Sequence, residues 1–190
     1  MKKNNLVIIS GPSGAGEDSI IDKLSKRIPI ERVITTTTRK KRSGEKDGDP
    51  YYFINKKIFL KKIKEGYFFE WAKQYNNNYY GVSFSEIERV RNTNKIGVWK
   101  IDYKGVIKAK ELVPGIISIL ITAPLEILED RIRRRGFVDE EYIRQRMDYT
   151  KEWLKHKEIY DFEVVNEEGK LDKTVSRVEK IIKENIGLDK

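Results

Sequence analysis

Cysteine is absent from the 190-residue chain, and histidine occurs once, at His156. Without thiols the chain forms no disulfide and no thiolate metal site, which is compatible with a reducing cytosol. His156 stands among lysines late in an expected helix, so we do not expect it to act as a general base. No apolar run has the roughly 18 residues of a transmembrane helix, and the run after MKKNN is too short for a secretory signal. We therefore expect a cytoplasmic protein with no membrane partner.

Acidic residues are the minority among the charged side chains. Lysine and arginine number 39 against 30 aspartates and glutamates, which gives a formal net charge of +9. A basic surface suits phosphorylated ligands or nucleic acid, and charge alone does not choose between them. The positive residues are spread over most of the chain and no RNA-binding motif occurs, so nucleic acid ranks last among the expected partners. The sequence does not predict an oligomeric state.

Apolar strand-like runs alternate with helical patterns, which predicts an α/β fold with a mainly parallel sheet. The expected strands are residues 6–10, 97–102, 116–122 and 162–165. The expected helices are residues 18–28, 125–135, 140–156 and 171–186. Residues 35–83 break this rhythm, because they are rich in Thr, Tyr and Phe with turn residues between them. They predict a small β-rich insertion with a site of its own inside a single domain.

The stretch SGPSGAGEDSI (10–20) follows the first expected strand and is rich in glycine. Gly11 and Gly16 have the spacing of the phosphate-binding pattern G-x-x-x-x-G-K-[ST], but Glu17 and Asp18 stand where Lys and Ser/Thr belong. A strand, a glycine-rich turn and a helix N-terminus bind anions through backbone N–H groups and the helix dipole. That function needs no side chain and survives here. The alternative is a turn with a purely structural role.

Two stretches of the insertion carry candidate ligand groups. TTRKKRSGEKDGDPYYF places Arg39, Arg42 and Tyr51 around a turn, where two guanidinium groups and a phenol suit the phosphate of a nucleoside monophosphate. The alternative is a solvated basic loop. FFEWA places Glu70 among aromatic residues, and a carboxylate accepts two hydrogen bonds from the N1–H and N2 amino group of guanine. The alternative for Glu70 is a surface position on an alternating strand.

Seven pieces of the sequence together resemble the guanylate kinase family, in order and through nearly the whole chain. They are SGPSGAG (10–16), TTRKKRSGE (37–45), YFFEWA (67–72), YYG (79–81), IDYKG (101–105), RRRG (133–136) and YDF (160–162). The resemblance implies a P-loop kinase fold and the reaction ATP + GMP giving ADP + GDP with Mg²⁺. It implies a parallel central sheet flanked by helices, a β-rich GMP-binding insertion and a helical lid. Their expected limits are a core of residues 1–34, 84–124 and 149–190, the insertion 35–83 and the lid 125–148.

The resemblance also implies a role for individual residues of this chain. The GMP phosphate would be held by Arg39, Arg42, Tyr51 and Tyr80, and the guanine would be read by Thr35, Glu70 and Asp102. The lid arginines Arg131, Arg135 and Arg146 would close over the transferring phosphoryl group. The ATP-binding set is Gly11, Ser13, Gly14, Ala15, Gly16, Glu17, Asp18, Ser19 and Asn166. With Arg39 and Lys100, the three lid arginines form the expected catalytic set.

Four positions depart from the family pattern. Glu17 replaces the P-loop lysine, Asp18 replaces the hydroxyl residue that holds Mg²⁺, Lys100 replaces the first acid of a D-I-D segment, and Val82 replaces Ser or Thr beside the guanine. Two unit charges about 4 Å apart interact by roughly 4 kcal/mol at an effective dielectric constant of 20. Reversing the charge at position 17 therefore turns a strong attraction for ATP into a comparable repulsion.

A lysine has left the P-loop while another has appeared at the end of a neighbouring strand, which suggests a charge swap. Glu17 and Lys100 would pair, or Lys100 would itself reach the phosphates. Asp18, with Glu17, would then offer the hard oxygen ligands that Mg²⁺ prefers. The competing interpretation is a catalytically inactive guanylate-kinase-like domain that binds GMP or a phosphorylated partner. The retained acceptor residues and lid arginines favour the kinase.

Overall fold

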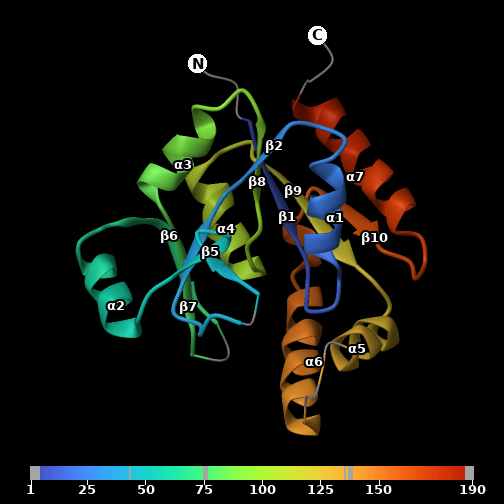
Figure 1. Ribbon diagram of the computed structural model, residues 1–190. Helices are drawn as coiled ribbons and strands as arrows, with labels where there is room; N and C mark the ends of the chain where they lie inside the picture. The colour runs from blue at the N-terminus through green and yellow to red at the C-terminus, as the bar shows by residue number, and fades with distance from the viewer. Residues whose placement is uncertain (1–4, 43, 75–76, 135, 137–138, 187–190) are drawn as a thin grey trace.

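A central five-stranded sheet forms the core of the computed structural model, which describes residues 5–42, 44–74, 77–134, 136 and 139–186 (Figure 1). The strands follow the order β10-β9-β1-β8-β2, and all four neighbouring pairs are parallel. Their bounds are β1 Leu6–Ser10, β2 Ile30–Arg32, β8 Ile96–Trp99, β9 Ile117–Thr122 and β10 Phe162–Val165. In parallel strands all carboxyl ends lie at one edge of the sheet, so the segments after β1, β8, β9 and β10 meet there.

Side-chain alternation along β1 explains why both faces of this sheet are covered. Val7 and Ile9 pack with α1 (Glu17–Leu24) and α7 (Leu171–Ile186) on one face. Leu6 and Ile8 pack with α3 (Phe84–Arg91) and α4 (Tyr103–Leu112) on the other. All five residues of β1 are buried, as expected of a central parallel strand. These two apolar layers fix the positions from which the loops of the carboxyl edge project.

A second, mixed sheet lies beside the first and is built from the insertion (residues 35–83) (Figure 1). Its strands follow the order β4-β5-β3-β7-β6, with bounds β3 Thr35–Thr37, β4 Lys46–Asp47, β5 Pro50–Phe53, β6 Phe68–Lys73 and β7 Tyr79–Ser83. Helix α2 (Lys56–Lys64) packs on it through Phe59, whose ring stacks on Phe68 with centroids 4.3 Å apart. The register of β6 shifts between Phe68 and Glu70, which marks a bulge directly beside Glu70.

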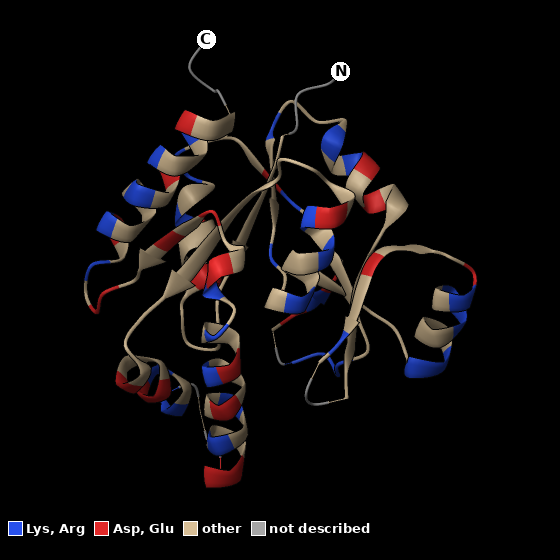
Figure 2. Ribbon diagram, turned by 180° about the vertical axis from the view of Figure 1, so that it is seen from behind, with Lys and Arg blue, Asp and Glu red and all other residues tan. Residues whose placement is uncertain are grey.

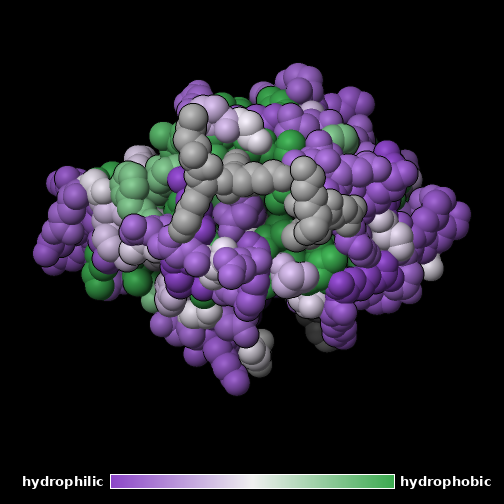
Figure 3. Space-filling model, turned by 90° about the horizontal axis from the view of Figure 1, so that it is seen from above, coloured by the Kyte–Doolittle hydropathy of each residue, from purple (hydrophilic) through white to green (hydrophobic). Residues whose placement is uncertain are grey.

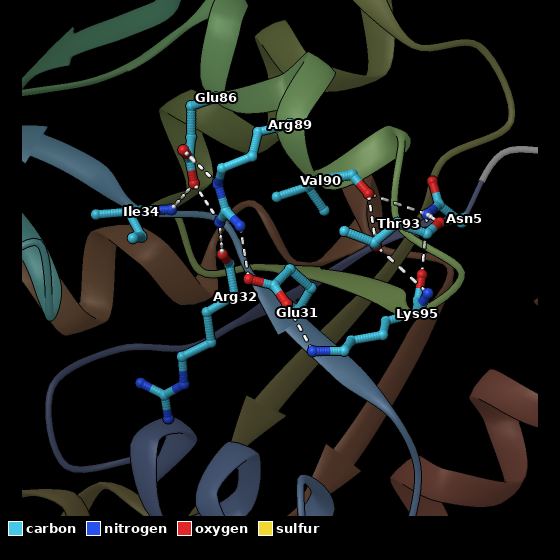
Figure 4. Close-up of polar contacts among 9 residues, drawn as sticks. All are labelled: Asn5, Glu31, Arg32, Ile34, Glu86, Arg89, Val90, Thr93 and Lys95. Carbon is cyan, nitrogen blue, oxygen red and sulfur yellow. Dashed lines mark hydrogen bonds and ion pairs between the residues drawn. The ribbon is translucent and has the colours of Figure 1, made fainter.

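One buried carboxylate links the two segments where the chain passes between the core and the insertion (Figure 4). Glu86 in α3 is 6% exposed and accepts a 2.7 Å hydrogen bond from the backbone N–H of Ile34, which leads into β3. Arg89 donates to both oxygens of Glu86, to Glu31 and to the carbonyl of Arg32. A buried carboxylate needs such a partner to offset its desolvation. This network sets how the insertion leaves the core.

Helices α5 (Leu125–Arg133) and α6 (Glu140–Leu154) project from the same end of the central sheet as the insertion (Figure 1). Ile132, Ile143 and Met147 form an apolar cluster between the two helices. Asp139 caps α6 by accepting a hydrogen bond from the N–H of Tyr142. A one-turn 3-10 helix, η1 (Lys157–Ile159), leads from α6 towards β10.

Charged residues of both signs alternate along α6, while lysines dominate α2 (Figure 2). Viewed from the end where the termini lie, most of the molecular surface is hydrophilic, with smaller apolar areas between (Figure 3). Within the described ranges, no helix is both long and apolar enough to cross a membrane.

The α/β fold with a parallel sheet and a β-rich insertion, expected from the sequence, is confirmed. The differences lie at element ends and in β2, α3 and α4, which were not among the expected elements. The helix expected over 18–28 ends at Leu24, five residues before Pro29, which makes the α conformation unfavourable for Ile28. The strand expected over 97–102 ends at Trp99, because Asp102 caps α4. The short edge strand β2 (Ile30–Arg32) has only three half-buried residues and gave no recognisable alternation.

Candidate functional site

A cavity of about 630 Å³ opens at the carboxyl edge of the central sheet, between the insertion and α6. Five segments line it: the P-loop with the start of α1, the insertion, the Lys100–Asp102 segment after β8, Ile132 of α5, and α6. The sequence-predicted residues on its wall are Gly11, Ser13, Gly14, Glu17, Asp18, Thr35, Arg39, Arg42, Tyr51, Glu70, Tyr80, Lys100, Asp102 and Arg146. Ala15, Gly16, Ser19, Arg131 and Asn166 lie outside the set that lines it. Arg135 falls outside the described residues.

The P-loop backbone is held in a conformation that requires glycine at two points. Gly14 and Gly16 have φ values of 90° and 92°, and a Cβ at Gly14 would lie 2.7 Å from the carbonyl oxygen of Leu128. Gly16 is the N-cap of α1, whose first turn carries Glu17 and Asp18. Glu17 and Asp18 line the cavity, so the N-terminal end of α1, the kind of helix end that binds anions, lies at the cavity wall.

Asn166 and Arg131 support the P-loop from outside the cavity. The buried side chain of Asn166 donates 2.8 Å to the carbonyl of Ala15 and accepts 3.1 Å from the hydroxyl of Thr174. Arg131 donates to the carbonyls of Gly14 and Asn166, at 3.2 and 3.0 Å, and pairs with Glu168 at 2.9 Å. In this conformation both residues contact P-loop backbone, whereas the sequence predicts roles against the nucleotide for each.

Lys100 and Asp18 form an ion pair across the mouth of the P-loop. The Nζ atom of Lys100 lies 2.7 and 2.8 Å from the two carboxylate oxygens of Asp18, and 5.7 Å from the centroid of the Tyr51 ring. The charge swap expected from the sequence named Glu17 first; the structure pairs Lys100 with the next residue. Burial opposes the charge of Lys100, but Tyr51 and the carboxylates of Asp18 and Glu17 together raise its pKa above the ordinary value. Lys100 therefore stays protonated.

The phosphate-binding candidates of the insertion are preorganised by an acid that the sequence did not single out. Glu45 receives two hydrogen bonds from the guanidinium of Arg39, at 3.0 and 2.7 Å, and one from the backbone N–H of Arg42. The hydrogen bond from Arg39 is the main reason that the pKa of Glu45 is lowered. Arg39 also lies 5.3 Å from the centroid of Tyr51, and the Tyr51 and Tyr80 rings are 6.2 Å apart. Arg39, Arg42, Tyr51 and Tyr80 therefore lie together on one part of the cavity wall.

Glu70 is a buried carboxyl group on the cavity wall. It lies in β6 next to the bulge, is 5% exposed, and its Oε1 atom has no hydrogen-bond partner among the described residues. Burial, with a smaller contribution from the nearby carboxylate of Asp102, raises its pKa to about 8, while Lys108 acts in the opposite direction. An orphaned buried acceptor costs free energy, so its retention points to a ligand donor that fills it.

Asp102 holds its place beside Glu70 through two hydrogen bonds. It caps α4 by accepting 2.9 Å from the N–H of Gly105, and it accepts 3.0 Å from the hydroxyl of Tyr149 in α6. Thr35, 4% exposed, completes this part of the wall at the start of β3. Val82 is fully buried and packs with the apolar cluster of α3 and α4, so it does not line the cavity.

Helix α6 supplies one predicted residue and three that the sequence analysis missed. The guanidinium of Arg146 donates 2.6 Å to the hydroxyl of Ser13 in the P-loop and lies 5.0 Å from the centroid of Tyr142. Tyr142, Tyr149 and Trp153 line the cavity as well. Their spacing of seven and four residues places them on one helix face, and this was the available signal.

Glu17 and Asp18, which the sequence analysis expects to hold Mg²⁺, both lie on the cavity wall. A divalent magnesium ion bound to a nucleotide takes one or two carboxylates, with phosphates and waters as its other ligands. No group of three or more His, Cys, Asp or Glu side chains able to hold a metal occurs in the described part of the chain. The two P-loop carboxylates therefore fit a phosphate-bound Mg²⁺ in type and number, provided that Lys100 leaves Asp18.

The chain is similar to known proteins over almost its whole length. A family model described as guanylate kinase matches residues 3–185. A guanylate kinase of Carboxydothermus hydrogenoformans is 36% identical over 184 residues, covering 96% of this chain and 89% of the relative. One of Mesomycoplasma hyopneumoniae is 35% identical over 195 residues, covering 98% of each. The crystal structure of guanylate kinase from Anaplasma phagocytophilum has a TM-score of 0.76 at 26% identity, covering 99% of this chain and 89% of that one.

Proposed function

Because the chain belongs to the guanylate kinase family, a family of nucleoside monophosphate kinases, we propose that it transfers a phosphoryl group from ATP to GMP or dGMP. The products are ADP and GDP. GMP is chosen as the acceptor because of Glu70, a buried residue on the cavity wall whose Oε1 atom has no hydrogen-bond partner among the described residues. Once ionised, this carboxyl accepts hydrogen bonds from both the N1–H and the N2 amino group of guanine.

The acceptor half of the site has two parts. Arg39, Arg42, Tyr51 and Tyr80 bind the phosphate of GMP, since guanidinium groups bind phosphate oxygens in a bidentate, charge-assisted way. Thr35, Glu70 and Asp102 bind the guanine. Glu45 is then the group that GMP phosphate competes with for Arg39, because both are anions that present two oxygens to one guanidinium.

The donor half relies on Lys100 in place of a P-loop lysine. Its Nζ lies between Asp18 of the P-loop helix and Tyr51 of the insertion, so one cation borders both halves of the cavity. We propose that Lys100 moves from Asp18 to the phosphates when ATP binds, which frees the carboxylates of Asp18 and Glu17 to hold Mg²⁺. Bound with the nucleotide, the metal ion neutralises phosphate charge. At close range each such contact contributes about 4 kcal/mol.

Arg146 is the proposed lid residue at the transferring phosphoryl group. It already reaches the P-loop through Ser13, and cations aimed at developing charge are the main catalytic device of phosphoryl transfer. Arg131 maintains the P-loop backbone in this conformation and would have to leave Glu168 to contact a nucleotide. A contribution of Arg135 remains part of the proposal on the strength of the family resemblance alone.

Phosphoryl transfer by the purified protein tests this proposal. The assay combines Mg²⁺, ATP or GTP as donor, and a panel of nucleoside monophosphates, with product separation by chromatography. GDP formation from GMP at an enzyme-like rate supports it, and Glu70→Gln should remove the preference for GMP. The inactive binding domain is the second candidate, because the Lys100–Asp18 pair neutralises the two groups a donor site needs. Calorimetric binding of GMP without any GDP formation would establish that candidate and overturn the kinase.

A further inference from the structure

Four segments at the carboxyl edge are joined by an unbroken row of hydrogen bonds that neither half of the nucleotide site uses. The indole Nε1 of Trp153, in the last turn of α6, donates 2.9 Å to the hydroxyl of Tyr160. The hydroxyls of Tyr160 and Ser10 are 3.0 Å apart, and Ser10 donates 2.6 Å to the carbonyl of Ile101. Ser10 ends β1 immediately before the P-loop, and Ile101 stands between Lys100 and Asp102.

The number of hydrogens on each group determines which atom donates and which accepts in each of these hydrogen bonds. A serine hydroxyl has one hydrogen, which Ser10 gives to Ile101, so the contact with Tyr160 is one in which Tyr160 donates. Indole nitrogen only donates, so Tyr160 accepts from Trp153. Burial raises the pKa of Tyr160, which keeps its proton in place. All three side chains are thus satisfied in a single arrangement, and aligned bonds of this kind reinforce one another.

The row holds the C-terminal end of a helix whose other end is far from the sheet. Helix α6 extends away from the central sheet below the P-loop (Figure 1). At a rise of 1.5 Å per residue, Arg146 lies about 10 Å and Glu141 about 18 Å along the helix from Trp153. A tilt of about 10° at Trp153 would move Arg146 by about 2 Å. A misplacement of about 1 Å in a reacting constellation can lower the rate about a hundredfold.

We propose that Tyr160 is a positioning residue, which sets the angle of α6 against the P-loop through Trp153 and Ser10 and so places Arg146 over the phosphate site. The proposal rests on the phosphoryl transfer proposed above. Trp153 packs on Tyr103 and Leu120, and Tyr149 donates a hydrogen bond to Asp102, so α6 is held against the core at more than one point. The Trp153–Tyr160–Ser10 hydrogen bonds add a directional restraint at the C-terminal end of the helix, from which its tilt is set.

Tyr160→Phe tests the proposal, since it keeps the ring and deletes the central hydroxyl. We expect kcat with GMP and ATP to fall at least tenfold, while the Kd of GMP measured without donor stays within twofold. Trp153→Phe breaks the same row, so the double variant should be no slower than the slower single variant. Thr93→Ala is the matched control: it deletes a hydroxyl that donates 2.8 Å to the carbonyl of Val90, before the start of β8 and so at the opposite edge of the sheet, and should leave kcat unchanged.

A distance measurement separates this proposal from the question of activity. Because the chain has no cysteine, Glu141→Cys on α6 and Arg177→Cys on α7 provide two defined spin-label sites. We expect the distribution of label distances to broaden, or its mean to shift by about 3 Å, in the Tyr160→Phe background and not in the Thr93→Ala background. An unchanged distance overturns the proposal, as does a kcat within twofold of the parent. If the parent protein forms no GDP, the function proposed above fails and the distance alone decides the positioning role.

Discussion

Replacing Glu70 by glutamine should stabilise the protein at neutral pH, although it removes a site residue. The pKa of Glu70 is raised from 4.5 to about 8, so the folded protein keeps a proton there that the unfolded chain has lost above pH 4.5. Stability falls with pH wherever the native state binds more protons than the unfolded state. The wild-type protein therefore loses about 1.36 kcal/mol per pH unit between 4.5 and 8, and Glu70→Gln, which mimics the neutral acid, does not.

The magnitude follows from the span of that window. The difference in free energy of unfolding between Glu70→Gln and wild type should increase by about 3 kcal/mol, in favour of the variant, from pH 5 to pH 7. Against a total stability of about 5–15 kcal/mol this is a large effect. With a urea m-value of about 2 kcal/mol/M, the difference between the unfolding midpoints of the two proteins should change by about 1.5 M over this pH range. Urea titrations of both proteins at half-unit pH steps measure it directly.

Glu45→Gln is the matched control from the same cavity. Arg39 lowers the pKa of Glu45, so its carboxylate is ionised in both folded and unfolded chains above pH 5, and it contributes stability that is lost only as pH falls further. The control should be less stable than wild type by a constant amount between pH 5 and pH 7. A difference between Glu70→Gln and wild type that is equally flat over this range would refute the assignment of the proton to Glu70.

Three further changes test the proposed chemistry by steady-state kinetics and binding. Lys100→Asp should lower kcat/KM for ATP about a thousandfold, and adding Glu17→Lys with Asp18→Ser should restore much of it; improvement by Lys100→Asp alone would contradict the charge swap. Arg146→Gln should lower kcat about a hundredfold with an unchanged Kd for GMP, and an equal change in both would place it in ground-state binding. Arg39→Lys should raise the KM for GMP about tenfold, because lysine cannot bind phosphate in a bidentate way; an unchanged KM would remove Arg39 from the phosphate site.

Sequence patterns predicted an element well where apolar residues recur with the period of a helix or strand, or where residues such as glycine mark a turn. The strand-turn-helix around Gly11–Gly16 combines an apolar run with obligatory glycines, and Leu171–Ile186 was located to its end residues by its apolar period. Glu70 was singled out as a carboxylate among aromatic residues, with a surface position as the alternative, and its 5% exposure rules that alternative out. Its orphaned oxygen and raised pKa were not recognisable from the sequence, because they depend on Asp102 and on burial by segments distant in sequence.

The limits of sequence reasoning appear at pairings between segments. Spacing alone does not say which of Glu17 and Asp18 faces Lys100, because successive helical residues point about 100° apart and the phase of α1 depends on how Gly16 starts it. Likewise, nothing in the sequence distinguishes an Arg131 that contacts nucleotide from one that contacts the carbonyl of Gly14. Which partner a side chain contacts depends on the path of the loops between the two segments, and loop length alone does not determine that path.

The exchange between Lys100 and the P-loop acids is compatible with the fold because of where the strands end. β1 and β8 are neighbours and parallel, with Ile8 opposite Trp99, so the first turn of α1, which follows β1 and the P-loop, and Lys100, which follows β8, face the same space. Glu17, Asp18 and Lys100 all line the cavity, so exchanging charge among them disturbs no core packing. Asn166 has no such freedom: a Cβ on Gly16 would lie 2.7 Å from its amide nitrogen, inside the tightly packed support of the P-loop. Charge at the cavity should therefore be exchangeable in compensating pairs, whereas the backbone supports of the P-loop should tolerate no exchange.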